Sequence, residues 1–181
     1  MKRRAGVVAG TAVPLPLCGV ALAATVACPN RPGGICVGTN QADTLNGRSV
    51  ADDMRGRGDA DRLRALRGAD FLNAGPANDA LQGAEGGDRY VFGDDWGDDT
   101  LADAAGGRDT LDFSGVAAGV TADLTPGEGA ETYVNGLNTV DFSATTIIED
   151  ALGGSEQDYL SGCLRRHAVS SFCYRAALLH R

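Results

Sequence analysis

The chain has 181 residues, a length that suits one or two domains. It contains 26 glycines and 19 aspartates but only ten aromatic residues, so it lacks the large apolar side chains on which an ordinary enzyme core depends. Residues 24–162 hold nine arginines, no lysine and all 24 acidic residues, which gives this body a net charge of −15. Such a charge argues against binding to nucleic acid and indicates a cationic partner. Because the only histidines are His167 and His180, a histidine-based catalytic centre inside the acidic body is excluded.

The N-terminus has the pattern of a secretory signal peptide. Basic residues at positions 2–4 precede an uncharged apolar stretch over residues 5–24, and Ala21 and Ala23 supply the small-x-small pattern that signal peptidase requires. An uncleaved membrane anchor is the alternative, but two prolines interrupt the stretch and its length barely spans a bilayer. We therefore expect residues 1–23 to be a cleaved signal peptide and the mature protein to be secreted.

Four cysteines follow the signal peptide, namely Cys28, Cys36, Cys163 and Cys173. Export permits disulfides, and four cysteines allow three pairings among which a sequence does not choose. The segment between Cys28 and Cys36 is rich in proline and glycine, which favours a local bridge between these two. A thiolate metal site is less favoured because no CxxC pair is present. Small residues before Cys28 also make a lipid anchor at this cysteine a minor alternative to free secretion.

An aspartate recurs every nine residues, and an apolar residue stands two positions after each one. The aspartates are Asp43, Asp52, Asp61, Asp70, Asp79 and Asp88, and the apolar residues are Leu45, Met54, Leu63, Leu72, Leu81 and Tyr90. A period of nine does not keep one helix face apolar over six cycles, and the glycines would weaken a helix. Each unit instead divides into a six-residue turn and a three-residue strand whose middle residue points inward. Two units then complete one coil, and coils stack at about 4.8 Å.

This stacking places aspartates eighteen residues apart directly above one another. Asp43, Asp61 and Asp79 fall in one column, and Asp52, Asp70 and Asp88 fall in a second. Carboxylates at that spacing repel one another unless a cation lies between them. Calcium suits such a position because it accepts about 6–8 oxygen ligands, including backbone carbonyls, whereas magnesium requires a tighter octahedron. The expected cofactor is therefore Ca²⁺.

The units resemble the nonapeptide G-G-x-G-x-D-x-U-x of the RTX, or haemolysin-type calcium-binding, repeat family. Residues 86–93, 106–114 and 153–161 resemble further segments of that family, so the resemblance covers about residues 38–162. It implies an all-β fold, a parallel β-roll (a β-helix-like solenoid) with two repeats per coil and calcium held in the turns. It adds three metal ligands to the six regular aspartates, namely Asp99, Asp109 and Asp158. The turns expected to supply backbone ligands contain Gly38, Gly47, Gly56, Gly68, Gly83, Gly86 and Gly153.

The glycines of the family's pattern are incomplete. In the first six units the fourth position is glycine only at Gly68 and Gly86, and the other four units have Gln41, Val50, Asp59 and Ala77 there. If these positions require a positive φ, the β-branched Val50 is the least suitable substitute. We therefore expect weakened calcium sites next to Val50 and Ala77.

The sequence divides into segments of different composition. We expect an N-terminal cap with a disulfide, a calcium-binding repeat block, a β-rich spacer, a further repeat and an atypical basic tail, at residues 24–37, 38–112, 113–152, 153–162 and 163–181. Strands within residues 116–124 and 139–148 of the spacer are expected to extend the roll.

The function that these features predict is that of a secreted, non-catalytic calcium-binding module that folds when it meets extracellular calcium. A largely disordered acidic protein with few working sites is one alternative. A non-catalytic remnant of a secreted protease or lipase that carries such a roll is another, since neither HExxH nor GxSxG is present. Calcium ions are the expected partners, with no nucleic acid and no membrane beyond the export signal, and no protein partner is specified.

Overall fold

The structure is a computed structural model that describes residues 22–103, 106–124, 131–134, 138–143 and 145–161. These residues form fifteen strands and no helix, so none of them belongs to a helix that could cross a membrane. The signal peptide, the tail over residues 163–181, and with it Cys163 and Cys173, lie outside the described residues.

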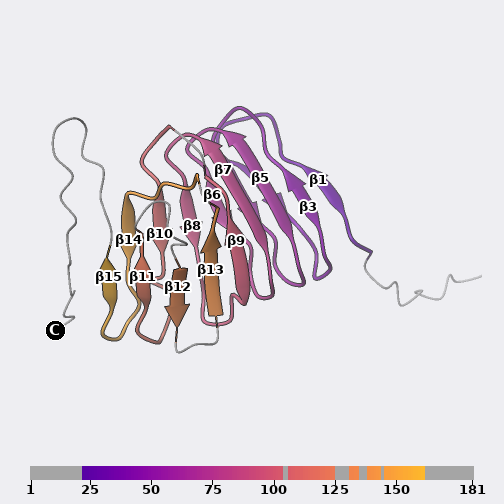
Figure 1. The fold of residues 1–181 in the computed structure, drawn as a ribbon. Helices are drawn as coiled ribbons and strands as arrows, with labels where there is room; N and C mark the ends of the chain where they lie inside the picture. Colours follow the sequence, from indigo (N-terminus) through magenta and orange to yellow (C-terminus); the bar gives the residue numbers. More distant parts are fainter. Residues whose placement is uncertain (1–21, 104–105, 125–130, 135–137, 144, 162–181) are drawn as a thin grey trace, which may run out of the picture.

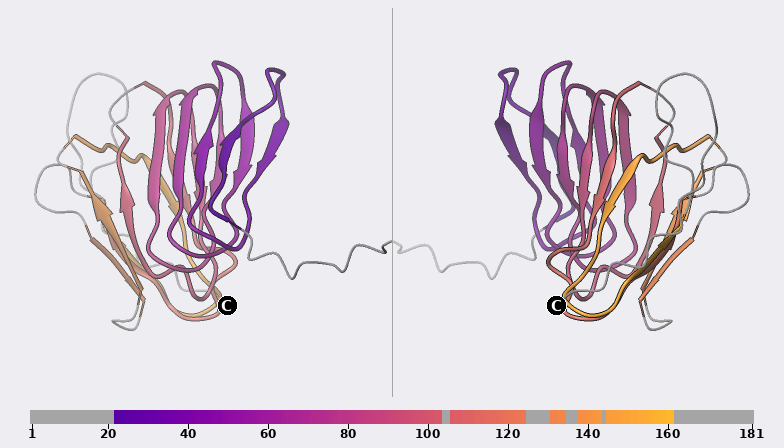
Figure 2. Two further views of the ribbon diagram at one scale, coloured as in Figure 1. Left: turned by 90° about the vertical axis from the view of Figure 1, so that its right-hand side faces the viewer. Right: turned by 90° about the vertical axis from the view of Figure 1, so that its left-hand side faces the viewer.

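The strands form two stacked sheets that lie face to face, and turns at the ends of the strands join one sheet to the other (Figure 2). The larger sheet contains, in spatial order, β1 (Thr25–Ala27), β3 (Thr44–Asn46), β5 (Arg62–Arg67), β7 (Ala80–Glu85), β9 (Asp98–Leu101), β13 (Asn138–Phe142), β12 (Glu131–Val134), β11 (Thr121–Asp123) and β15 (Tyr159–Ser161). The smaller sheet contains β14 (Asp150–Leu152), β10 (Thr110–Asp112), β8 (Arg89–Val91), β6 (Phe71–Asn73), β4 (Asp52–Arg55) and β2 (Gly34–Val37). Consecutive strands alternate between the sheets through β10, so the chain winds as a solenoid (Figure 1).

The strand register confirms that two nonapeptide units make one coil. In the larger sheet Leu45 pairs with Leu63 and Leu63 with Leu81, each step being eighteen residues. In the smaller sheet Met54 pairs with Leu72 in the same parallel register. Because successive side chains of a strand point to opposite sides, this register stacks the apolar residues into a ladder inside the roll. The predicted parallel β-roll is therefore confirmed.

The interior is narrow and filled by these stacked residues. Leu45, Leu63 and Leu72 have no exposed surface. Toward the later coils three aromatic rings fill the space, with centroids 4.8 Å apart for Phe92 and Phe113 and 5.6 Å apart for Phe92 and Trp96. These three rings form one packed cluster in the interior of the later coils.

The spacer extends the roll, but its strands differ from the expected ones. β11 and β13 occupy only part of the expected ranges, and β12, which the sequence did not indicate, pairs antiparallel with both. Residues 145–148 form no strand, because side-chain hydrogen bonds take the place of the backbone hydrogen bonds of a sheet there. Thr146 Oγ1 donates to the carbonyl of Leu101 at 3.1 Å and accepts from the amide of Asp103 at 3.2 Å.

The segment before the first repeat unit completes the first coil. β1 pairs with β3 and β2 with β4, both parallel. A disulfide joins Cys28 and Cys36, which are each 1% exposed and close the apolar interior at this end. The bond occupies the sulfur atom that a lipid anchor at Cys28 would require.

Candidate metal centre

Eight of the nine sequence-predicted aspartates lie at or just before the start of a strand, and Asp99 is the second residue of β9. All nine side chains point into the roll. An aspartate and the apolar residue two positions later share this inward side, because side chains alternate along a strand. All nine are buried, with 1–3% of their surface exposed: Asp43, Asp52, Asp61, Asp70, Asp79, Asp88, Asp99, Asp109 and Asp158. Such burial is exceptional for a charged side chain and requires compensating contacts.

A chain of hydrogen bonds links the aspartates of the larger sheet from coil to coil. The backbone amide of Asp43 donates to Oδ1 of Asp61 at 2.7 Å, and the amide of Asp61 donates to Oδ1 of Asp79 at the same distance. Asp79 continues the chain by donating to Oδ1 of Asp99 at 2.8 Å. These four residues form the first column of what we call the aspartate ladder. The longer turn before Asp99 therefore does not interrupt the column.

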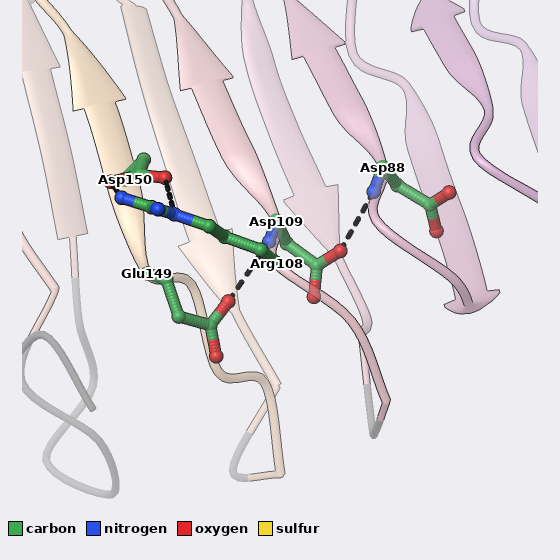
Figure 3. A network of polar contacts seen from close by, with 5 residues as sticks. All are labelled: Asp88, Arg108, Asp109, Glu149 and Asp150. Carbon is green, nitrogen blue, oxygen red and sulfur yellow. Dashed lines mark hydrogen bonds and ion pairs between the residues drawn. The ribbon is translucent and has the colours of Figure 1, made fainter. Parts of the chain in front are cut away.

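The second column of the aspartate ladder runs along the smaller sheet. The backbone amide of Asp52 donates to Oδ1 of Asp70 at 2.7 Å, and the amide of Asp70 donates to Oδ1 of Asp88 at 2.9 Å. The amide of Asp88 then donates to Oδ1 of Asp109 at 2.8 Å, across a separation of 21 residues. Glu149 ends this column, because its Oε2 accepts from the amide of Asp109 at 2.9 Å (Figure 3).

Asp158 lies apart from both columns, at the start of β15. Its Oδ1 accepts from the amide of Val120 at 2.9 Å and from that of Gly154 at 3.1 Å. The arrangement of an aspartate bonded to the backbone of a neighbouring coil is therefore repeated at the far end of the roll.

The bonds of the aspartate ladder satisfy only one oxygen of most carboxylates. The other oxygen is buried and has no hydrogen-bond partner among the described residues at Asp52, Asp61, Asp70, Asp79, Asp88, Asp99 and Asp158. A buried carboxylate oxygen without a partner is costly, and natural proteins rarely contain several in a row. An array of such atoms fits bound cations.

Burial also changes how readily these carboxyl groups ionise. Loss of solvent, reinforced by the neighbouring carboxylates, raises the pKa of Asp61 to about 6 and that of Asp79 to about 7. In the second column burial raises the pKa of Asp70 to about 7 for the same reasons. Asp99, nearer the middle of the roll, has a pKa of about 8, again mainly because of burial. A bound cation would favour the charged form and reverse these shifts.

The first-position glycines provide the space for these oxygens. A Cβ at Gly56 would lie 2.2 Å from Oδ2 of Asp61 and 2.4 Å from the carbonyl oxygen of Ala74. Gly83 is similar, since its Cβ would lie 2.1 Å from Oδ2 of Asp88. At Gly56 a carboxylate oxygen and a backbone oxygen thus point into one small space, which is the mixed donor set that calcium prefers.

The other glycines predicted to lie in ligand turns fall into two groups, those that lie against the backbone of a neighbouring coil and those that lie against an aspartate oxygen. Gly68 and Gly86 adopt φ of +146° and +137° and lie against the backbone of the preceding coil, where a side chain would collide with it. A Cβ at Gly38 would lie 2.7 Å from Oδ2 of Asp43, and one at Gly153 would lie 1.8 Å from Oδ2 of Asp158. Gly47 closely approaches Ala65 of the next coil instead.

The backbone also shows which substituted turn positions are strained. Val50 does not adopt a positive φ, so the expected conflict at this residue is absent. Ala77, at the same fourth position three units later, has φ of +99°. Arg57 and Leu66, which stand at the second position of their repeat units, also have positive φ. The strain therefore lies in the middle units and not at Val50.

A third carboxylate joins the second column where its register changes. Asp88, Asp103 and Asp109 each place a carboxylate oxygen within 4.8 Å of the others, and all three are buried. The hydroxyl of Tyr90 bonds to Asp103 and accepts from the amide of Gly83 at 2.9 Å. Burial, followed by the charge of Asp103, raises the pKa of Tyr90 above its usual range, so the phenol stays neutral.

Asp103 was not among the aspartates that the sequence predicted as ligands, because it lies outside the nine-residue period. The alternation of β9 nevertheless carries the signal. Asp99 and Leu101 both point inward, so the next residue but one is expected to do so as well. Three convergent carboxylates make this group, which we call the Asp88 cluster, the densest set of hard oxygen ligands in the described part of the chain.

Comparison with known proteins supplies the family of the chain. The family described as Peptidase M10 serralysin C terminal matches residues 74–177, more than half of the chain. The chain belongs to this family. The serralysin C-terminal domain is the RTX-type calcium-binding nonapeptide repeat region, so the resemblance drawn from the repeat units is confirmed. No match was found among curated proteins.

The extent of the match adds two points. It is to the C-terminal repeat domain of serralysin-type proteases and not to their catalytic domain. It begins at residue 74, in the fifth repeat unit, whereas the coils before it follow from their register with the later ones. The serralysin-type roll of this chain thus starts well before the matched segment.

Proposed function

We propose that this serralysin-type repeat domain is an extracellular, non-catalytic calcium-binding module that folds when calcium occupies the aspartate ladder. The observation that carries the proposal is the array of buried carboxylate oxygens without protein partners. The ladder aspartates, together with the Asp88 cluster and Asp158, would hold the ions. Calcium would neutralise the stacked charges and complete the hydrogen-bonding capacity of these oxygens.

Charge and core size explain why folding would depend on the ion. The body between residues 24 and 162 has a net charge of −15, and its interior is a single narrow ladder of apolar side chains. Self-repulsion opposes the compact state at low calcium. An ion that binds the folded roll and not the unfolded chain stabilises it in proportion to RT ln(1 + [L]/Kd). Extracellular modules of this kind bind calcium at about 10⁻⁴–10⁻³ M, which suits a switch between the inside and the outside of a cell.

Calcium titration of the full chain tests the proposal. Far-UV circular dichroism in EDTA is expected to show an unordered spectrum, and millimolar calcium is expected to convert it into a β spectrum. Isothermal titration calorimetry measures the binding itself. A spectrum that stays unordered at all calcium concentrations would favour the disordered acidic protein and sink the proposal.

Substitutions in each column locate the ions. Asp61→Asn and Asp70→Asn, one in each column, are expected to raise the calcium midpoint of folding by about tenfold or more, since each removes a charged ligand. Asp59→Asn is the matched control, because Asp59 is exposed in the same turn as Asp61, accepts a hydrogen bond from the neighbouring amide of Ala60, and acts on Asp61 through its charge alone, so it removes the same charge without removing a buried ligand. Equal midpoints for all three variants would contradict the assignment of ligands.

A further inference from the structure

The outer face of the larger sheet carries a groove that the aspartate ladder does not use. The groove has a volume of about 570 Å³ and crosses β5, β7, β9 and β13, which are neighbours at the centre of Figure 1. Arg62, Ala80, Thr100 and Asp141 stand in one register row across these four strands. The two middle strands present the small side chains of Ala80 and Thr100 in this row, which leaves a hollow in the face. Arg62 and Arg64 form one side of the hollow, the arginine wall, and Asp141 stands on the opposite side, the aspartate wall.

Neither arginine of this wall forms an ion pair with an acidic residue of the described part of the chain. Four arginines of the described residues form ion pairs with carboxylates, namely Arg55, Arg67, Arg89 and Arg108. Arg62 has no side-chain partner among the described residues, and Arg64 bonds only to the neutral Oε1 of Gln82, at 3.3 Å. Both are exposed and line the groove. In so acidic a chain, two adjacent guanidinium groups without a carboxylate are available to an external anion.

Charge along the roll favours the approach of an anion from this side. Residues 22–67 contain seven arginines and five acidic residues, and three of those five belong to the buried aspartate ladder. Residues 68–161 contain two arginines and nineteen acidic residues. The surface is therefore basic over the first coils and acidic over the later ones. The groove lies at the boundary, with its arginines on the basic side.

The aspartate wall, opposite Arg62 and Arg64, determines what kind of anion fits the groove. Asp141 and Ser143 line it, and both are exposed. A carboxylate there repels a second anionic group but accepts hydrogen bonds from the hydroxyls of a sugar. Neutral hydrogen-bonding groups of Thr100 and Gln82 lie between the walls.

We propose that this groove binds an acidic oligosaccharide, with one uronic acid held by Arg62 and Arg64 and a neutral, hydroxyl-bearing ring directed toward Asp141. The planar guanidinium fork matches the geometry of a carboxylate, and a second arginine beside it adds a further charged donor. An acidic peptide is a poorer occupant for two reasons. Asp141 opposes a run of carboxylates, and the strands that floor the groove are hydrogen-bonded on both sides, so no free edge is available for an added strand.

Calorimetry on the full chain in saturating calcium tests the proposal with the disaccharide of glucuronic acid and xylose as the probe. Measurable binding is expected, with xylobiose, its neutral counterpart, bound at least about tenfold more weakly. The double variant Arg62→Gln/Arg64→Gln is expected to lose a similar factor. Arg67→Gln is the matched control, since Arg67 lies on the same strand outside the groove and pairs with Glu85. No binding of the acidic disaccharide by the folded protein overturns the proposal.

A second comparison separates a sugar from a peptide. Triglutamate is expected to bind more weakly than the disaccharide, and Asp141→Asn is expected to weaken the disaccharide while tightening triglutamate. Tighter binding of triglutamate to the unchanged protein contradicts the sugar assignment. Circular dichroism of each variant at saturating calcium confirms that the roll is folded, so this result is independent of whether calcium drives folding. If the double variant fails to fold, the two single arginine variants give the same comparison.

Discussion

The amide of Asp61 donates a 2.7 Å hydrogen bond to Oδ1 of Asp79, which lies eighteen residues further along the chain and one coil away. The bond positions one oxygen of the Asp79 carboxylate, and the other oxygen, Oδ2, is buried with no partner among the described residues. One side chain would thus serve both coil stacking and the proposed ion binding. Its Oδ1 holds the neighbouring coil in register, and its Oδ2 is the proposed cation ligand. Substitutions that separate these two roles therefore give sharp tests.

Asp98 and Asp99 provide a matched pair for such a test. Asp99 is 1% exposed and carries an unpartnered Oδ2, whereas Asp98 is exposed on the outer face and accepts from Thr139 Oγ1 at 3.0 Å. Asp99→Asn keeps an acceptor for the amide of Asp79 but removes the charge. It is expected to weaken calcium binding by about tenfold or more. It is also expected to stabilise the calcium-free roll, because an amide costs less to bury than a carboxylate. Asp98→Asn should change both far less, because Asp98 acts on Asp99 only through its charge. Calcium titrations measure the first effect, and the β signal of far-UV circular dichroism in EDTA at pH 5 measures the second.

The pH dependence of the calcium-free roll should be opposite to ordinary acid denaturation. Burial raises the pKa of Asp70 and Asp79 from 3.8 to about 7, and that of Asp99 to about 8. Groups whose pKa is higher in the folded state stabilise it fully below their unfolded pKa and lose that contribution as the pH rises through the folded pKa. In EDTA, where the chain is expected to be unordered near neutral pH, acidification from pH 8 to pH 5 should therefore increase the β signal in far-UV circular dichroism.

The calcium-bound roll should show the reverse trend. Protons and calcium compete for the same oxygens, so the calcium midpoint should rise as the pH falls from 8 to 5. Asp99→Asn removes one titrating group and should reduce the pH dependence in EDTA. A calcium-free protein that becomes less stable on acidification would show that the ladder carboxylates are not the groups that titrate.

The period of nine residues was sufficient to predict the coil, the inward aspartates and their two columns, because strand alternation and stacking leave little freedom. It was insufficient for three features. Asp103 lies outside the period, and its burial follows from β9 and not from the repeat. The antiparallel β12 interrupts an otherwise parallel sheet in a segment without a repeat. The positive φ values of Arg57 and Leu66 fall at a second position that the residue types do not reveal, since neither residue favours that conformation.

Backbone strain in the middle units predicts a stabilising substitution. Ala77 has φ of +99°, a conformation that costs a residue with a Cβ about 1 kcal/mol. Ala77→Gly should therefore stabilise the folded roll by about 1 kcal/mol and lower the calcium midpoint. Val50 stands at the same position of an earlier unit without a positive φ, so Val50→Gly should destabilise by about 0.5–1 kcal/mol instead. Urea unfolding at fixed calcium compares the two, and equal effects would contradict the assignment of strain to Ala77.

Close stacking of the turns predicts where an added methyl group is not tolerated. A Cβ at Gly86 would lie 1.3 Å from the carbonyl oxygen of Gly68, and Gly86 also has φ of +137°. Gly86→Ala is expected to destabilise the roll by at least about 2 kcal/mol, since the coil above must shift. Gly93→Ala is the control, because nothing lies within 4 Å of its added Cβ and its φ is not positive. A melting temperature of Gly86→Ala equal to that of Gly93→Ala would show that the coils are more loosely stacked.

The Asp88 cluster can be observed separately from the regular ladder, because Tyr90 is bonded to one of its carboxylates. A terbium ion in place of calcium at this cluster would be excited by energy transfer from an adjacent phenol. Asp103→Asn is expected to weaken terbium binding here by about tenfold while leaving the early coils folded, since Asp103 takes no part in the hydrogen bonds that link the coils of either column. Tyr90→Phe should remove the tyrosine-excited emission. It should also cost about 1–3 kcal/mol of stability, because the amide of Gly83 loses its acceptor. Tyrosine-excited emission of the same intensity in Tyr90→Phe would place the ion elsewhere, next to another aromatic residue.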